Sequence, residues 1–169
     1  AVRLAARDYP CHNYAVASSR NLPVMTSSID LGMCIFSPVN DSEVARAVRP
    51  NGYYLEVGPA AQHLWELKTA LYEQPREHSL LRRAIPGGAL LQEGECHYEK
   101  QLTQTELQAV LAATPFAFRG HREKREGLRE QSDFVITLGF SWRLFRLAAE
   151  RDTVASGAVL GAALESTDL

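Results

Sequence analysis

The chain has 169 residues, of which 46% are hydrophobic and 22% charged, and its formal net charge is -2. This length suffices to bury one core, so we expect one soluble domain, and the charge argues against a protein that is basic overall. Three cysteines in no zinc-ligand spacing predict neither a disulfide framework nor a metal site, and the absence of a long apolar run or an export signal predicts a cytoplasmic protein without membrane contact.

The first half of the chain predicts alternating helices and strands. Asn40 and Glu43 have the spacing of a helix capping box, residues 50–52 have turn composition, and three leucines between 64 and 71 form one apolar stripe. The predicted elements are a helix over 2–9, a short buried strand over 13–18, a strand over 29–36, a helix from 40 to about 48, a strand over 53–58 and a helix over 60–73. This alternation is typical of a parallel sheet with right-handed crossovers.

The second half begins with a loop over 75–88 that is rich in arginine and in helix-breaking residues. Residues 95–102 predict a strand, and Thr103 with Glu106 forms a second capping box that opens an amphipathic helix. Residues 133–140 predict a final strand. We therefore expect one domain over residues 1–147, followed by an Ala/Gly/Ser-rich tail over 148–169 that is frayed or disordered.

Several segments carry a resemblance to one enzyme family. They are VASSRNLP at 16–23, IDLGMCIFSPVNDSEVARAVRPNGYYLEVGP at 29–59, QHLWELKTALYE at 62–73, TPFAFR at 114–119 and SDFVITLGF at 132–140. In this order and spacing, the chain resembles the C-terminal part of 23S rRNA guanine-N1 methyltransferases that use S-adenosylmethionine. The resemblance implies an α/β, Rossmann-like class I methyltransferase fold that is incomplete at its N-terminus.

The resemblance also implies a cofactor site at the carboxyl ends of the strands. Ala17 and Ser18 would border the adenine of S-adenosylmethionine, together with Leu22. A second wall would run under the methionine and ribose, formed by Cys34, Ile35 and Phe36. The alternative is that Ala17 is small for packing and that Ser18 caps a turn.

Candidate catalytic residues follow from the same resemblance. Ser37 and Pro38 would face the target base, although a Ser-Pro pair in a loop is also an ordinary turn. His63 and Glu66 are spaced to share a helix face, where they would bind RNA or help to remove the proton from guanine N1. The alternative for His63, Glu66 and Lys68 is a solvated helix surface.

Positive charge gathers in two loops, which predicts contacts with RNA phosphates. The candidate RNA-binding residues are Lys68, Arg82, Arg83, Arg119, Arg122, Lys124 and Arg125. Glu123, Glu126 and Glu130 alternate with the second cluster, so an exposed helix with internal salt bridges explains it as well.

The resemblance further implies a zinc module, a glycine-rich cofactor loop and an acidic ribose-binding residue, none of which this sequence contains. We therefore expect this chain alone to bind the cofactor weakly and to be inactive, with its exposed sheet edge covered by a missing N-terminal half or by a second copy. The first hypothesis is methyl transfer from S-adenosylmethionine to guanine N1 of 23S rRNA. The alternatives are a small-molecule methyltransferase of the same fold and a non-catalytic interaction module.

Overall fold

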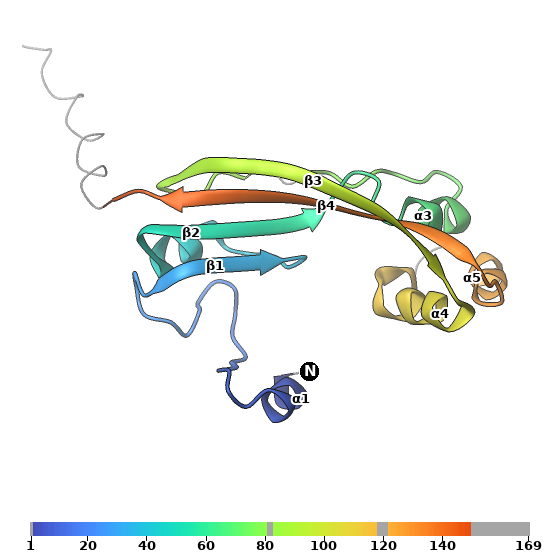
Figure 1. The fold of residues 1–169 in the computed structure, drawn as a ribbon, viewed down its shortest axis with the longest axis horizontal. Helices are drawn as coiled ribbons and strands as arrows, with labels where there is room; N and C mark the ends of the chain where they lie inside the picture. Colours follow the sequence, from blue (N-terminus) through green and yellow to red (C-terminus); the bar gives the residue numbers. More distant parts are fainter. Residues whose placement is uncertain (1, 81–82, 118–121, 150–169) are drawn as a thin grey trace, which may run out of the picture. The chain divides into compact units, whose positions relative to one another are not determined.

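A computed structural model describes residues 2–80, 83–117 and 122–149 (Figure 1). The predicted mixture of helices and strands is confirmed. In chain order, the elements are α1 (Val2–Asp8), β1 (Ile29–Ile35), α2 (Asp41–Ala47), β2 (Val48–Pro59), α3 (Trp65–Leu71), β3 (Gly88–Leu102), α4 (Gln104–Ala113), the 3-10 helix η1 (Pro115–Ala117), α5 (Arg122–Arg129) and β4 (Phe134–Leu147).

The strands form a sheet in the order β1-β2-β4-β3. The arrows of β1 and β2 point the same way in Figure 1, as the predicted strand-helix-strand pattern requires, whereas β4 points the opposite way. The backbone N–H of Ala60 donates to Gly139 at 3.1 Å, and that of Leu64 donates to Thr137 at 2.8 Å, so the chain leaving β2 also runs antiparallel to β4. The expectation of a parallel sheet is therefore wrong for β4.

The described residues fall into two compact units. The first unit lies within residues 1–56, 83–92 and 143–169, and the second within 57–82 and 93–142. The buried core of the first unit consists of Val44, Val48, Tyr54, Ile85, Phe145 and Leu147. The buried core of the second consists of Leu64, Leu67, Leu71, Leu102, Leu107, Leu111, Phe116, Leu128 and Ile136.

The third helix is shorter than predicted. It spans Trp65–Leu71, because the N–H of Leu64, which in a helix from Ala60 would donate to the Ala60 carbonyl, donates to Thr137 of β4 instead. Leu64 adopts a left-handed backbone conformation (φ 55°) at the start of α3. The leucine stripe itself is confirmed, since Leu67 and Leu71 are fully buried.

The prediction of a strand over residues 13–18 is wrong. Residues 13–17 have no regular structure, and Ser18 forms only an isolated bridge with Asn21. The side chain of Val16 is 85% exposed, so this short apolar run has neither a pairing strand nor a buried face. The turn predicted over 50–52 lies inside β2, where Asn51 has a positive φ of 61°.

Both predicted capping signals mark helix starts. The Asn40 side chain accepts from the backbone N–H of Glu43, and Thr103 with Glu106 forms a complete capping box. At α2 the reciprocal half is missing, because the Glu43 carboxylate accepts from the N–H of Leu22 instead. The two last strands are confirmed and are longer than predicted.

None of the described helices combines the length and apolar character that crossing a bilayer would require.

Leu67 provides a test of the core of the second unit. Because it is fully buried, we expect Leu67→Ala to lower the free energy of unfolding by about 2–5 kcal/mol through lost burial and a residual cavity. Denaturant unfolding measures this change. Leu4→Ala is the matched control, since Leu4 on α1 is 55% exposed, and a similar loss in both variants would contradict the assigned core.

Candidate functional site

A cavity of about 690 Å³ lies in the first unit. Its walls come from the loop before β1, from β1 and the loop after it, and from α2 and β2. The lining residues are Ala15, Ala17, Ser19, Leu22, Pro23, Val24, Ile29, Gly32, Met33, Cys34, Ile35, Ser37, Pro38, Val39, Val44, Ala47, Val48 and Tyr54. None of these lining residues is an aspartate, glutamate, histidine, lysine or arginine, so the described wall suits an apolar or aromatic ligand group.

The structure brings together most of the residues predicted to bind the cofactor or face the base. Those that line the cavity are Ala17, Leu22, Cys34, Ile35, Ser37 and Pro38. Ser18 is outside this set, and its hydroxyl accepts from the N–H of Arg20 at 3.2 Å, which fits the alternative of a turn cap. Phe36 is also outside it, 47% exposed and with a positive φ of 49°.

Sequence reasoning missed Tyr54, whose side chain is only 2% exposed at the base of the cavity wall. Its ring centroid lies 6.2 Å from that of Phe145. Burial raises the pKa of the Tyr54 hydroxyl, and neighbouring Cys34 and Glu56 raise it further, so the phenol stays protonated. The sequence carried no signal for it, because the charged Glu56 shares a face of β2 with Tyr54, and that face is the buried one only in the structure.

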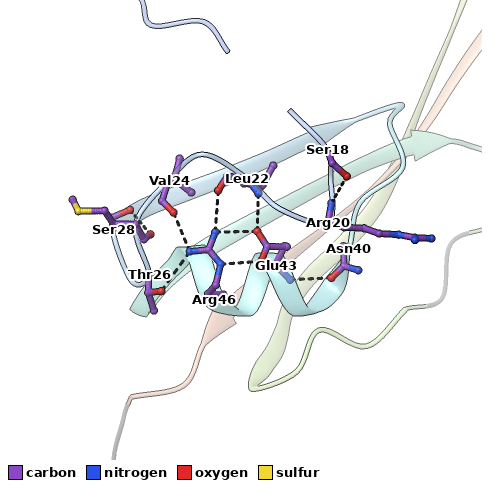
Figure 2. A network of polar contacts seen from close by, with 10 residues as sticks. Ser18, Arg20, Leu22, Val24, Thr26, Ser28, Asn40, Glu43 and Arg46 are labelled. Carbon is purple, nitrogen blue, oxygen red and sulfur yellow. Dashed lines mark hydrogen bonds and ion pairs between the residues drawn. The ribbon is translucent and has the colours of Figure 1, made fainter. Parts of the chain in front are cut away.

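A second missed feature is an ion pair on α2 that holds the loop before β1 (Figure 2). The Glu43 carboxylate accepts from the backbone N–H of Leu22 at 2.8 Å. The Arg46 guanidinium donates to the carbonyl oxygens of Val24 at 2.9 Å and Leu22 at 3.2 Å, and it pairs with Glu43 at 2.8 Å. We call this pair the α2 clamp. Since Leu22 and Val24 line the cavity, the clamp sets the position of one wall.

The clamp is electrostatically strong for an interaction near the surface. The hydrogen bond from Arg46, followed by that from the Leu22 N–H, lowers the pKa of Glu43 to about 2. Glu43 is therefore ionised at any physiological pH. Its i,i+3 spacing from Arg46 was visible in the sequence, but that spacing does not reveal the loop carbonyls that Arg46 binds.

The two predicted catalytic residues of α3 and its preceding turn lie in the second unit. His63 is 9% exposed, and its ring lies 5.4 Å from Phe140 and 6.0 Å from His78 between centroids. Burial lowers the pKa of His63 despite an opposing hydrogen bond to the backbone carbonyl oxygen of Gly139. The imidazole is therefore neutral at pH 7, as a proton acceptor must be.

Glu66 is tied to β4. Its carboxylate accepts from the Thr137 backbone N–H at 2.8 Å and from the Thr137 hydroxyl at 2.6 Å. Burial alone would raise the pKa of Glu66, but the bonds from Thr137 outweigh burial and the pKa lies below its usual value. Glu66 is thus an anion engaged in holding α3 to β4, which weakens it as a base.

Two candidate RNA-binding cations are engaged inside the protein. Lys68 is 8% exposed and donates to the carbonyl oxygen of Arg76 at 2.7 Å. Arg83 pairs with Glu56 and donates to the carbonyl oxygen of Val39. The solvated-surface alternative is therefore wrong for Lys68 and for His63. The predicted residues Arg82 and Arg119 lie outside the described part of the chain.

The remaining candidate cations lie on α5. Arg122, Arg125 and Arg129 line a recess of about 250 Å³ together with Glu126. Arg122 pairs with Glu126 at 2.8 Å in an i,i+4 arrangement, as the salt-bridged alternative expected. Leu128 anchors the helix, being buried in the core of the second unit. Across the described residues, no group of three or more histidine, cysteine or acidic side chains is arranged to hold a metal ion.

Comparison with known proteins returns relatives of one kind. A Bacillus subtilis protein provisionally named 23S rRNA (guanine-N1)-methyltransferase YxjB is 28% identical over 130 residues, 74% of this chain and 46% of its own length. The 23S rRNA (guanine(748)-N1)-methyltransferase of Streptomyces fradiae is 40% identical over 72 residues, 42% of this chain and 26% of its own. The chain is related to 23S rRNA guanine-N1 methyltransferases.

A third relative, from Micromonospora griseorubida and provisionally given the same enzyme name, is 30% identical over 127 residues, 70% of this chain and 42% of its own length. The predicted resemblance is therefore confirmed. The chain spans less than half the length of each of these relatives. No family model matches the chain.

Solved structures with a similar fold include a provisionally named methyltransferase of Bacillus halodurans, 11% identical, with a TM-score of 0.48 over 88% of this chain and 79% of its own. The YcgJ protein of Bacillus subtilis is 17% identical, also with a TM-score of 0.48, over 88% of this chain and 78% of its own. With TM-scores below 0.5, neither likeness supports a statement about function or ligands.

The α2 clamp can be tested by removing its cation. We expect Arg46→Met to release the loop over residues 18–28, because two carbonyl oxygens and Glu43 lose their donor. Hydrogen exchange of peptides from this loop measures the change, and we expect about tenfold faster exchange. Arg20→Met is the control, since Arg20 lies in the same loop with an exposed side chain. Equal exchange in both variants would show that the clamp does not hold the loop.

The buried histidine predicts a pH dependence. The pKa of His63 in the folded chain lies below its ordinary value of 6.5, so the unfolded chain takes up a proton first as the pH falls. The free energy of unfolding should therefore be level above about pH 7 and decrease below pH 6.5, until the lower folded-state pKa is reached. Melting temperatures at pH 7.5 and 5.5 measure this.

In this experiment, His63→Gln should reduce the difference between the two pH values. It should not abolish that difference, because burial also lowers the pKa of His78. The exposed His12 provides the control variant His12→Gln, which should keep the full pH dependence. An unchanged pH dependence in His63→Gln would contradict the assignment.

Proposed function

We propose that the protein transfers a methyl group from S-adenosylmethionine to N1 of a guanine in 23S rRNA. The names of the curated relatives support the reaction and the substrate. The observation that carries the proposal for this chain is the cavity, which gathers Ala17, Leu22, Cys34 and Ile35 from segments that are separate in sequence. The family resemblance implies the same residues as cofactor contacts, independently of the geometry.

The cavity walls fit part of the proposed cofactor. Ala17 is small enough to leave room for a flat ring, and the apolar side chains of Leu22 and Ile35 suit the faces of an adenine or a thioether chain. The described lining carries no charge, so groups elsewhere must bind the charged amino-acid end and the ribose. S-adenosylmethionine supplies an electrophilic methyl group bonded to a sulfonium.

Two further roles, orienting the base and accepting its proton, are proposed separately for one residue of each unit. Ser37 is the polar side chain in the loop after β1, and its hydroxyl can hydrogen-bond a base edge. Guanine N1 bears a hydrogen that must leave when the nitrogen is methylated. His63 is the better candidate acceptor, because its imidazole is neutral at pH 7 whereas Glu66 is held by Thr137.

The recess on α5 supports the choice of RNA as substrate. Three arginines of one short helix line it. A guanidinium group can donate two parallel hydrogen bonds to two oxygens of one phosphate. One glutamate, Glu126, neutralises part of this charge through Arg122. We propose that Arg122, Lys124 and Arg125 contact the RNA backbone and contribute affinity without sequence specificity.

A reverse-transcription assay on a 23S rRNA transcript tests the reaction, because methylation at N1 removes the Watson–Crick donor of guanine and stops the polymerase. A stop at one guanine that depends on S-adenosylmethionine is the expected result. Cofactor binding without any stop would favour the small-molecule methyltransferase instead. No cofactor binding, either by this chain or by this chain extended at its N-terminus, would favour the non-catalytic interaction module.

Ala17 tests the cofactor cavity directly. We expect Ala17→Phe to weaken S-adenosylmethionine binding more than tenfold, because the added ring occupies part of the cavity that the ligand would fill. Calorimetric titration measures the affinity, with each variant made in the chain extended at its N-terminus, because the chain alone is expected to bind weakly. Val16→Phe is the matched control, since the neighbouring Val16 is 85% exposed and does not line the cavity. If the two variants bind equally, the ligand does not occupy this cavity.

A further inference from the structure

The loop Ser37–Val39 follows β1, and all three of its residues line the cavity. The chain enters it through Phe36, which has a positive φ of 49°. On its β1 side the loop is held by the Cys34 thiol, which donates to the carbonyl oxygen of Ser37 at 3.1 Å. A single weak thiol bond does not fix a loop, so its position depends on what binds its other end.

Arg83 binds that other end from a distant part of the sequence. One guanidinium nitrogen of Arg83, Nη1, donates to the carbonyl oxygen of Val39 at 3.3 Å. The same nitrogen lies 3.8 Å from a carboxylate oxygen of Asp41, the first residue of α2. The second nitrogen, Nη2, pairs with Glu56 on β2. One planar group thus connects the loop and the start of α2 to the sheet.

Arg83 is itself held in place. Its partner Glu56 is 3% exposed, so this ion pair is largely shielded from water and from salt. The backbone carbonyl oxygen of Arg83 accepts from Arg143 of β4 at 2.9 Å. The Arg143 guanidinium also lies 4.9 Å from the centroid of the Phe145 ring. Arg83 therefore has a fixed backbone and a fixed side chain, as a group that positions a loop requires.

We infer that Arg83 is a positioning residue that fixes the loop Ser37–Val39 at the cavity, and is not an RNA contact. Its guanidinium is directed to a loop carbonyl and to two carboxylates of its own unit. The importance of this role for methyl transfer rests on the proposed function, in which Ser37 and Pro38 face the base. The structural role does not depend on that function.

Cys34 is a built-in reporter of this loop. Its thiol is half-buried and bonded to Ser37, whereas Cys11 and Cys96 are exposed. Loosening the loop should expose the Cys34 thiol and speed its alkylation by N-ethylmaleimide. The other two cysteines serve as internal references within the same sample, followed by mass spectrometry of their peptides.

The decisive variant is Glu56→Leu/Arg83→Met in the full 169-residue chain. Replacing both members of a buried ion pair with apolar side chains of similar size is often neutral for stability, so global unfolding and loop loosening can be separated. We expect an unchanged melting temperature and about tenfold faster alkylation of Cys34, corresponding to the loss of one ordinary hydrogen bond. An unchanged Cys34 rate in a folded double variant overturns the inference.

Arg83→Lys decides the question if the double variant does not fold. A lysine keeps the charge beside Glu56 but cannot bind Glu56 and Val39 together, so Cys34 should again react faster. A rate equal to that of the unaltered chain overturns the inference. Arg146→Met is the matched control, because exposed Arg146 in the same unit bonds only Asn51 among the described side chains, and it should leave the Cys34 rate unchanged.

Titration of S-adenosylmethionine into the same variants separates the two proposals. Weaker binding by both Arg83 variants, with normal binding by Arg146→Met, extends the positioning role to the cofactor site. If neither the unaltered chain nor this chain extended at its N-terminus binds the cofactor, the proposed function fails, while the alkylation rates of Cys34 still decide the role of Arg83.

Discussion

The backbone of the loop before β1 has to be hydrogen-bonded without a neighbouring strand, and the ion pair Glu43–Arg46 meets that need. A peptide group that loses water must find another partner, and Leu22 finds two on α2, one for its N–H and one for its carbonyl oxygen. Because the two side chains lie one helical turn apart, a single short helix serves as a template for an irregular segment. The ion pair Glu43–Arg46 therefore fixes the position of the cavity wall that contains Leu22 and Val24.

The same solution recurs on the other side of the cavity. Arg83 gives the carbonyl oxygen of Val39 the donor that no strand supplies, and buried Glu56 holds Arg83 in turn. Arginine suits both places, because its planar group can donate to a carbonyl and to a carboxylate at once. The two loops that would contact a ligand are thus held by charge-assisted bonds to regular elements, which makes their positions more reproducible than loop composition alone suggests.

The charged groups around the cavity and the groups that line it therefore have different tasks. The charged groups of the two ion pairs hydrogen-bond the backbone of the wall segments and do not line the cavity. The lining itself is apolar apart from a few hydroxyl and thiol groups, such as those of Ser37 and Tyr54. Such a wall can select a ligand by shape and by its apolar faces.

The sequence by itself determined the local features of this protein. Helix starts at Asn40 and Thr103, the buried leucines of α3, the strand after Ser28 and the relationship to guanine-N1 methyltransferases all follow from short patterns. The tertiary structure alone decided the rest. The missing strand over residues 13–18 is one example. The direction of β4, the shortened α3 and the contacts of Arg46 and Arg83 depend on partners between about 20 and 80 residues away, such as Val24, Glu56 and Thr137. Hydrogen bonds between residues so far apart leave no periodic pattern in a sequence. Closing a longer loop costs little extra free energy, so the sequence separation does not restrict which donor pairs with a given acceptor.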